Sequence, residues 1–167
     1  ETENTLNIEN KIQTLGKDFA NSKGSMFLGR GYSYPIALEG ALKLKELAYV
    51  HAEGYPAGEM KHGPLALIEE GMPVVVIAPR DEHYKKTISN MQEVISRGAK
   101  VLLITNKSTD EIYSENIWEQ IEVDAISDEL IPFLTTIPLQ KLAYYSALDK
   151  GYDIDKPRNL AKSVTVE

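Results

Sequence analysis

The stretch Pro73-Val74-Val75-Val76-Ile77-Ala78-Pro79 decides the fold class of this chain. Its apolar residues follow one another without polar alternation, and most of them are β-branched. Such a run is typical of a short strand that is covered on both faces, as the strands of parallel sheets are. The segment Val101-Leu102-Leu103-Ile104-Thr105 has the same character. We therefore expect both segments to be central strands of a parallel sheet.

Outward from these strands, helical patterns alternate with further strand-like segments. Apolar spacing and terminating residues predict helices at Asn4–Phe19, Pro35–His51, Glu82–Arg97 and Asp128–Lys150. Shorter segments predict strands at Ser25–Gly29 and Ile117–Val123, the second nearer the sheet edge because it mixes apolar and acidic residues. This alternation predicts an α/β fold: a doubly wound, mostly parallel sheet with helices on both faces, in a flavodoxin-like three-layer αβα arrangement.

Prolines and glycines mark the boundaries of these elements. Pro132 is tolerable in the early turns of the last helix, whereas Pro138 should kink that helix or split it in two. The glycine-punctuated stretch Gly54–Gly63 shows neither a helix nor a strand pattern, and Gly151–Glu167 has no clear period. We therefore expect an irregular segment after the second helix and an ordered or orderable tail at the end of the chain.

Composition excludes several classes of function. The 167 residues, 43% of them hydrophobic and 26% charged, predict one domain over residues 1–167. A net charge of −7 without a basic run argues against nucleic-acid and anionic-membrane partners. The absence of cysteine excludes thiolate chemistry and suits a reducing compartment. No run approaches the ~18 apolar residues of a membrane span, so we expect a cytoplasmic protein. The missing initiator Met suggests a fragment.

Three charged residues of the second helix share one face. Glu39, Lys43 and Glu46 stand at positions i, i+4 and i+7, which a helix of 3.6 residues per turn places in one stripe. As a solvated stripe, this pattern contributes only a few tenths of a kcal/mol per ion pair. If it faces a pocket, a desolvated carboxylate gains basicity and can move protons beside a carbonyl. Spacing alone does not choose between the two interpretations.

Other polar segments give weaker indications of a binding site. The turn Gly29-Arg30-Gly31-Tyr32-Ser33 precedes a helix N-terminus, where backbone N–H groups can hold an anion, but it matches no established phosphate loop. His62 lies between residues that constrain the backbone, as in a loop that presents a side chain, although a structural histidine has the same setting. The three histidines lack metal-ligand spacing, so we expect no metal. Lys162 has no pattern that distinguishes it from an ordinary tail lysine.

Longer segments resemble a known family. Ala37-Leu38-Glu39-Gly40-Ala41-Leu42-Lys43-Leu44-Lys45-Glu46 and Gly58-Glu59-Met60-Lys61-His62-Gly63-Pro64-Leu65-Ala66-Leu67 closely resemble the second sugar-isomerase (SIS) domain of the glucosamine-6-phosphate synthases. The ending from Asp155 to Glu167, with Arg158-Asn159-Leu160-Ala161-Lys162-Ser163 at its centre, is similar to the C-terminal tail of that family. The resemblance covers nearly the whole chain in the same order.

The resemblance implies roles for individual residues. The family makes glucosamine 6-phosphate from fructose 6-phosphate and glutamine-derived ammonia, without a cofactor. His62 would assist ring opening, across the interface of a homodimer. Lys162 would form a Schiff base with the open-chain ketose, Glu46 would move a proton between C1 and C2, and Lys43 would help that transfer. Further substrate contacts are expected from Glu39, Arg30 and Ala161, and residues 151–167 would be a catalytic tail.

The family enzyme also has a glutaminase domain and a first SIS domain with a phosphate loop, and this chain has neither. We therefore expect weak substrate binding and little or no turnover by the chain alone, which a steady rate of ketose-to-aldose isomerisation would refute. Two other functions stay open. The chain could be a non-catalytic module that binds or senses phosphosugars, or a structural half that dimerises through the helix Asp128–Lys150.

Overall fold

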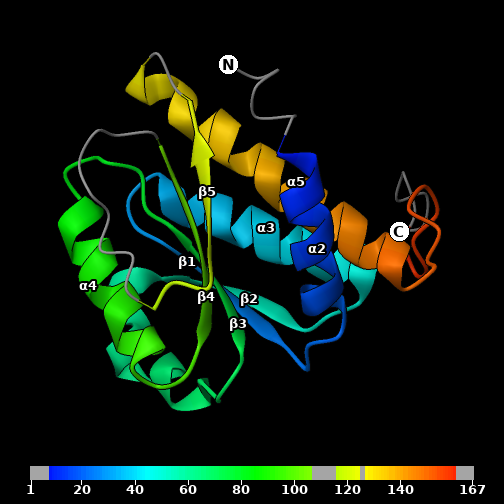
Figure 1. Cartoon of the computed structure of the whole chain (residues 1–167), viewed down its shortest axis with the longest axis horizontal. Coiled ribbons are helices and arrows are strands. Elements are labelled where there is room, and N and C mark those ends of the chain that lie inside the picture. The colour runs from blue at the N-terminus through cyan, green and yellow to red at the C-terminus, as the bar shows by residue number, and fades with distance from the viewer. Residues whose placement is uncertain (1–7, 107–115, 125–126, 161–167) are drawn as a thin grey trace, which may run out of the picture.

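The computed structural model describes residues 8–106, 116–124 and 127–160. A five-stranded parallel sheet runs through the described part of the chain, in the order β2-β1-β3-β4-β5 (Figure 1). Its strands are β1 (Ser25–Gly29), β2 (Ala52–Pro56), β3 (Pro73–Ile77), β4 (Lys100–Asn106) and β5 (Glu119–Val123). This order is that of a doubly wound flavodoxin-like sheet, so the predicted fold class is confirmed.

Helices cover both faces of the sheet. The α-helices are α2 (Glu9–Ala20), α3 (Ser33–Ala48), α4 (Tyr84–Ile95) and α5 (Ile131–Asp149), and the 3-10 helices are η1 (Ala57–His62), η2 (Pro64–Leu67) and η3 (Asp128–Leu130). One core lies between the sheet and the layer of α2, α3 and α5, and a second lies between the sheet and α4 with η1 (Figure 1). Because each central strand is buried on both faces, β1 and β3 have no exposed residue, as their apolar sequences predict.

Strand β2 was not predicted from the sequence. The second helix ends at Ala48 rather than at His51, and β2 begins at Ala52, in a stretch without a strand pattern. β2 contains Gly54 and ends in Pro56, both of which are disfavoured in strand interiors, and its place at the sheet edge makes them tolerable. Gly54 is required by close packing, because a Cβ at this position would lie 2.9 Å from the Cα of Leu38 in α3.

Pro138 does not split the last helix. α5 continues from Ile131 to Asp149 with Pro138 buried inside it, so the alternative of two shorter helices is wrong. Helix α5 packs against both α2 and α3, and these tertiary contacts offset the one backbone hydrogen bond that proline removes. The first helix is described from Glu9, and the expected start at Asn4 lies outside the described residues.

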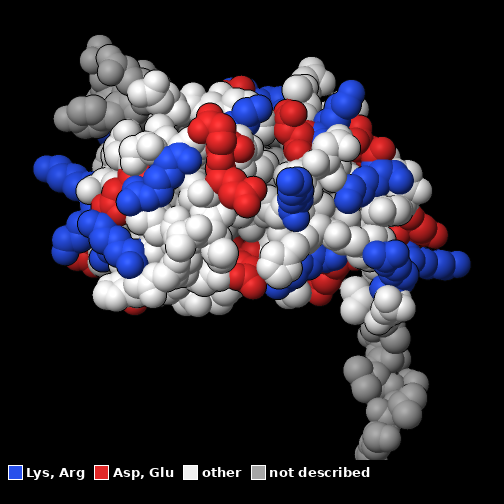
Figure 2. Space-filling model, turned by 90° about the horizontal axis from the view of Figure 1, so that it is seen from below, with Lys and Arg blue, Asp and Glu red and all other residues white. Residues whose placement is uncertain are grey.

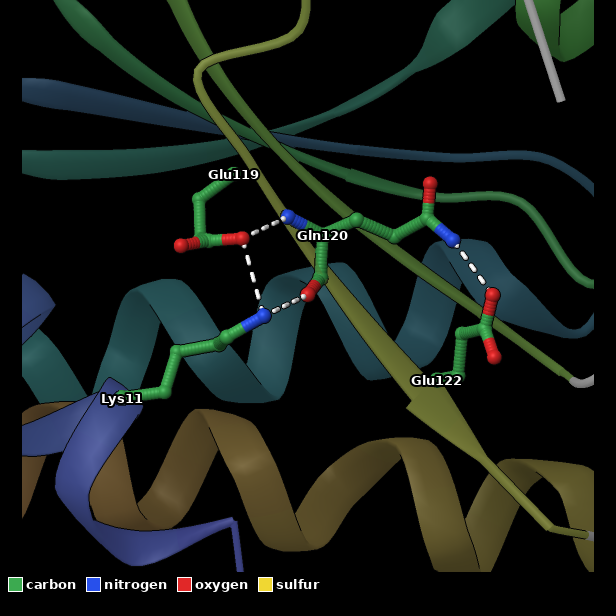
Figure 3. Close-up of polar contacts among 4 residues, drawn as sticks. All are labelled: Lys11, Glu119, Gln120 and Glu122. Atoms are coloured by element: carbon green, nitrogen blue, oxygen red, sulfur yellow. Dashed lines mark hydrogen bonds and ion pairs between the residues drawn. The ribbon is translucent and has the colours of Figure 1, made fainter. Parts of the chain in front are cut away.

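The expected edge position of the last strand is confirmed. β5 is the outer neighbour of β4, and Lys11 of α2 holds it in place (Figure 3). The Lys11 ammonium lies 2.9 Å from Glu119 Oε1 and 2.9 Å from the backbone carbonyl oxygen of Gln120. This contact joins an element from the beginning of the chain to the sheet edge and closes the layer of helices on that side.

Candidate active site

The three charged residues of α3 form one connected group. The Lys43 ammonium donates a hydrogen bond of 2.7 Å to Glu46 Oε2 and lies 3.8 Å from Glu39 Oε1. All three side chains are partly buried, with exposures of 29% for Lys43 and Glu46 and 36% for Glu39. Lys43 therefore pairs more closely with Glu46 than with Glu39, and the stripe is a hydrogen-bonded group rather than three separately solvated charges.

The surroundings of Lys43 favour its charged form. The hydrogen bond to Glu46 raises the pKa of the Lys43 amine above its ordinary value, and the charges of both carboxylates act in the same direction against partial burial. Lys43 is consequently an ammonium at neutral pH. It supplies a fixed positive charge beside Glu46, which suits a residue that orients a carboxylate and balances charge during proton transfer.

A cavity of about 660 Å³ lies against this stripe. Its wall comes from three helices and includes Glu39, Lys43, Glu9, Gln140, Lys141 and Tyr145. Among the lining residues, the Tyr145 hydroxyl of α5 donates a hydrogen bond to the Glu9 carboxylate of α2. That bond raises the pKa of Tyr145 to about 12 and lowers the pKa of Glu9. The cavity thus combines charged groups with phenolic and amide groups that suit a polyhydroxylated ligand.

The chain returns to the C-terminal end of α3 after α5. Tyr49, the first residue beyond α3, accepts a hydrogen bond of 2.7 Å from the backbone N–H of Arg158. The Arg158 guanidinium lies 4.1 Å from the centroid of the Tyr49 ring, and the ring of Tyr152 packs on Tyr49 at 4.8 Å. The last described turn of the chain is therefore held three residues beyond Glu46. Ala161 and Lys162 lie outside the described residues.

His62 is exposed at the end of η1, on the α4 side of the sheet. The segment is tied down by Lys61, whose ammonium lies 2.8 Å from Glu93 Oε1 in α4. Beneath it, the Arg30 guanidinium packs so closely under Gly58 that a Cβ there would lie 2.4 Å from Nη2. His62 thus lies at the end of a segment that an ion pair holds to α4, and the Arg30 guanidinium packs against that segment.

Glu46 and His62 come from elements on opposite faces of the sheet. α3, which carries Glu46, packs in the core that α2 and α5 share with the sheet. η1, which ends at His62, packs in the core on the α4 side. Within one copy of the chain, the structure joins Glu39, Lys43 and Glu46 to the last described turn of the tail, but it does not bring His62 to them.

A second cavity of about 610 Å³ opens where the strand order reverses, between the ends of β1 and β3. Ligands of doubly wound folds commonly bind at this place. Its polar lining is mainly acidic and comprises Ser33, Asp81, Glu82, His83, Asp128 and Glu129. The four carboxylates disfavour an anionic phosphate in this cavity.

The remaining surface gives no sign of other ligand classes within residues 8–106, 116–124 and 127–160. Acidic and basic side chains are interspersed on the face shown in Figure 2. No group of three or more metal-ligating side chains is gathered in this part of the chain. Its helices include none that is both long and apolar enough to cross a membrane.

The strand order β2-β1-β3-β4-β5 is that of the flavodoxin-like α/β domains. In this domain, a cavity with polar lining residues lies beside α3. A model of the SIS domain family matches residues 18–149. The chain belongs to the SIS domain family, as the motifs around Glu46 and His62 predict.

Curated relatives of the chain share one name. The chain is 52% identical over 162 residues to a glutamine–fructose-6-phosphate aminotransferase (isomerizing) of Bartonella henselae, covering 97% of this chain and 27% of that protein. A relative of the same name from Aquifex aeolicus is 52% identical over 165 residues, covering 99% of this chain and 28% of the relative. The chain thus spans little more than a quarter of the curated relatives that it matches.

A solved structure supports the same assignment. The C-terminal domain of glucosamine-fructose-6-phosphate aminotransferase from Francisella tularensis superposes with a TM-score of 0.88 at 46% sequence identity. The match covers 93% of this chain and 43% of the solved chain. The described strands and helices are therefore arranged as in part of that domain.

The residues that line the cavity opposite the α3 stripe were not predicted from the sequence. Glu9 and Tyr145 come from helices far apart in sequence, and no local pattern distinguishes them from surface residues. Tyr49 was not distinguishable in the sequence. In the structure it directly follows α3 and has the left-handed backbone conformation that glycine commonly adopts after a helix.

Proposed function

We propose that this chain is the second SIS unit of a glutamine–fructose-6-phosphate aminotransferase, which forms glucosamine 6-phosphate from fructose 6-phosphate and glutamine-derived ammonia. The resemblance of the motifs and the identity to relatives of that name over almost the whole chain support the assignment. The substrates, the homodimer, the cytoplasmic location and the role in amino-sugar biosynthesis all belong to this proposal, because the chain spans only part of those relatives.

One observation carries the proposed chemistry. The Glu39–Lys43–Glu46 stripe is hydrogen-bonded and partly buried, and Glu39 and Lys43 line a cavity. A ketose-to-aldose isomerisation requires a carboxylate held beside the carbons that exchange a proton. Glu46 is the proposed base, and Lys43 is the positioning cation that holds one of its oxygens.

The proposed reaction uses Lys162 to form the first imine at C2. In the ring-opened sugar, the Lys162 amine adds to the C2 carbonyl and water leaves, which forms an imine. Ammonia replaces the lysine nitrogen at C2 and releases the amine. Glu46 then accepts a proton from C1 and delivers a proton to C2, while the C1 hydroxyl loses its proton and the C2 nitrogen gains one, which gives the 2-amino aldose. No cofactor is required, because the imine itself accepts the electron pair.

His62 is proposed to act in the site of the partner subunit of a homodimer. Within one copy, Glu46 and His62 come from elements on opposite faces of the sheet, so the copy does not bring them together. A partner subunit related by a two-fold axis can present its own His62 to the Glu46 end of α3. Ring opening by a histidine needs only a side chain that titrates near neutral pH.

Mixing two inactive variants of the full-length enzyme tests this arrangement. His62→Gln and Lys162→Arg each remove one group, and a hybrid dimer keeps one site with both groups if His62 crosses the interface. Random mixing makes half of the dimers hybrids with one intact site of two, so about a quarter of the unsubstituted activity should return. Absence of recovery in verified hybrids would refute a shared site.

The position of the second cavity, rather than its acidic lining, is the one observation that favours another candidate function. A non-catalytic phosphosugar-binding module would bind its ligand at the switch point between β1 and β3, which holds 610 Å³ here. Asp81→Asn and Glu82→Gln should then alter glucosamine 6-phosphate binding, whereas Glu46→Gln should not. The opposite result favours the catalytic assignment.

A further inference from the structure

The Arg30 guanidinium, directly after β1, is partly buried and has no carboxylate within ion-pair distance among the described residues. Its Nε is fully buried and has no hydrogen-bond partner in the same part of the chain. Removing a charged group from water costs free energy unless the surroundings compensate for the lost hydration. The contacts of this guanidinium therefore indicate what keeps it in place.

Those contacts are made to the segment that ends in His62. The guanidinium lies against Gly58 of η1, where an added Cβ would lie within 3.6 Å of Cζ and of both terminal nitrogens. The side-chain amide of Asn90 in α4, which is 9% exposed, lies 3.3 Å from Arg30 Nη2 and 3.3 Å from the carbonyl oxygen of Ala57. Ala57 is the first residue of η1. Arg30 thus connects the end of β1 to η1, with a buried amide beside it.

Other contacts hold η1 at its later residues. Met60 is 1% exposed in the core on the α4 side, and Lys61 pairs with Glu93 through a side chain that is 61% exposed. An ion pair so exposed holds a segment only weakly. A 3-10 helix of six residues has few internal hydrogen bonds of its own, so its orientation depends on what packs against it. Loss of the guanidinium should therefore let the first turn of η1 shift, together with His62 at its end.

We propose that Arg30 is a positioning residue for ring opening, because its guanidinium holds η1 in the orientation that presents the His62 imidazole. The inference rests on the proposed function for the role of His62, whereas the support of η1 does not depend on that role. Ring opening breaks the bond between C2 and the ring oxygen, while the C2 hydroxyl loses a proton and the ring oxygen gains one. An imidazole serves both transfers only when it is held within hydrogen-bond reach of both oxygens.

Three substitutions separate the support of η1 from the charge of Arg30 and from folding. Arg30→Met keeps a long side chain and removes the guanidinium, and Arg30→Lys keeps the charge without the planar group that lies against Gly58. Gly58→Ala leaves Arg30 unchanged and pushes η1 away from it. Arg97→Met is the matched control, because Arg97 is exposed and its hydrogen bonds go to Glu93 and Ser96 at the end of α4.

Hydrogen exchange measures the support of η1 alone. In the full-length enzyme, the peptide that covers residues 57–62 should exchange at least about fivefold faster in Arg30→Met and in Gly58→Ala, as expected when one stabilising contact is lost. Arg30→Lys should also accelerate this exchange, and Arg97→Met should not. Peptides from β3 and β4 should keep their rates in all variants, which verifies the fold. Unchanged exchange of residues 57–62 in both Arg30→Met and Gly58→Ala would overturn the inference.

A substrate that cannot form a ring measures the chemistry. The C5 hydroxyl closes the furanose ring of fructose 6-phosphate, so 5-deoxyfructose 6-phosphate stays open and needs no ring opening. In Arg30→Met and Gly58→Ala, kcat with fructose 6-phosphate should fall about tenfold or more, whereas kcat with the deoxy ketose should change by less than about twofold. Equal losses with both substrates, or no loss with either, would overturn the positioning role.

His62→Gln distinguishes failure of the inference from failure of the proposed function. This variant should lose kcat with fructose 6-phosphate and keep it with the deoxy ketose. If it loses both equally while exchange of residues 57–62 still responds to Arg30→Met, the support of η1 stands, and the ring-opening role of His62 falls together with the positioning role. If His62→Gln discriminates between the substrates but neither readout responds to Arg30→Met or Gly58→Ala, the proposed function stands and the inference is wrong.

Discussion

Two lysines of this chain are held by carboxylates in nearly the same geometry, and they have different consequences. Lys11 of α2 lies 2.9 Å from Glu119 at the edge of the sheet, and Lys43 of α3 lies 2.7 Å from Glu46. The Lys11 side chain is 42% exposed and holds two structural elements together. Lys43 is 29% exposed, lies between two carboxylates and lines a cavity.

The surroundings of an ion pair, rather than its geometry, decide whether it is a candidate for catalysis. The Lys11 ammonium also donates a hydrogen bond to the backbone carbonyl oxygen of Gln120, so its N–H groups join α2 to β5 (Figure 3). Lys43 and its partners all come from one helix, so their pairing is not needed to connect elements of the fold. A group that joins no elements and faces a cavity is a better candidate for catalysis than one at a sheet edge.

The largest effect is expected for catalysis. In the full-length enzyme, Lys43→Met should lower kcat by about tenfold to a hundredfold, because Glu46 loses the cation that orients it. Lys11→Met should leave kcat unchanged. Steady-state formation of glucosamine 6-phosphate measures both, and circular dichroism checks that each variant is folded. Equal losses in the two variants would contradict the distinction between the lysines.

A stability effect should follow from the packing of α2. A Cβ on Gly16 would lie 2.7 Å from the Tyr145 Cβ of α5, so Gly16→Ala forces the helices apart and should cost about 1–3 kcal/mol of unfolding free energy. Urea denaturation measures this loss. Gln13→Ala on the exposed face of the same helix is the control and should change stability by less than about 0.5 kcal/mol.

A smaller effect is expected at the sheet edge. Lys11→Met removes a partly exposed ion pair and should cost no more than about 1 kcal/mol of unfolding free energy, less at high salt because screening already weakens the pair. Urea unfolding at low and high ionic strength gives both values. A loss that does not diminish with salt would mean that Lys11 acts through packing rather than charge.

The smallest effect concerns pH. The hydrogen bond to Glu9 raises the pKa of Tyr145 from 10.0 to about 12, so this contact contributes to stability below pH 10 and is lost as the pH rises through about 12. Glu9→Gln should return the Tyr145 pKa toward 10 with little change in stability at neutral pH. Titration of the Tyr145 ring carbon by NMR measures the shift, and an unchanged pKa in Glu9→Gln would assign it to another cause.

The central elements of the fold were predictable because their signals are local. β1 has the predicted bounds, and the bounds of β3 and β4 differ from the predicted ones by a residue or two, since short uninterrupted apolar runs have few alternatives in a covered sheet. β2 was not predictable, because its short edge segment with Gly54 and Pro56 is selected by pairing with β1 rather than by propensity. The Glu39, Lys43 and Glu46 stripe followed from helical spacing alone.

The cavity beside this stripe could not be predicted in the same way. Its opposite wall depends on the packing of α5 against α2, which brings together residues more than a hundred positions apart. The roles of His62 and Lys162 came from resemblance, and the structure adds only where the η1 segment and the last described turn lie. Tertiary contacts, not local patterns, determine these parts of the site.

Exchange of sugar protons with solvent tests the central claim most directly. In the full-length enzyme, Glu46→Gln should lower the rate of deuterium incorporation at C1 and C2 by at least about a hundredfold, the usual contribution of a general base. Fructose 6-phosphate binding should change little, because no step of binding requires the carboxylate to accept a proton. Exchange at close to the unsubstituted rate in Glu46→Gln would contradict the assignment of the α3 stripe as the catalytic group.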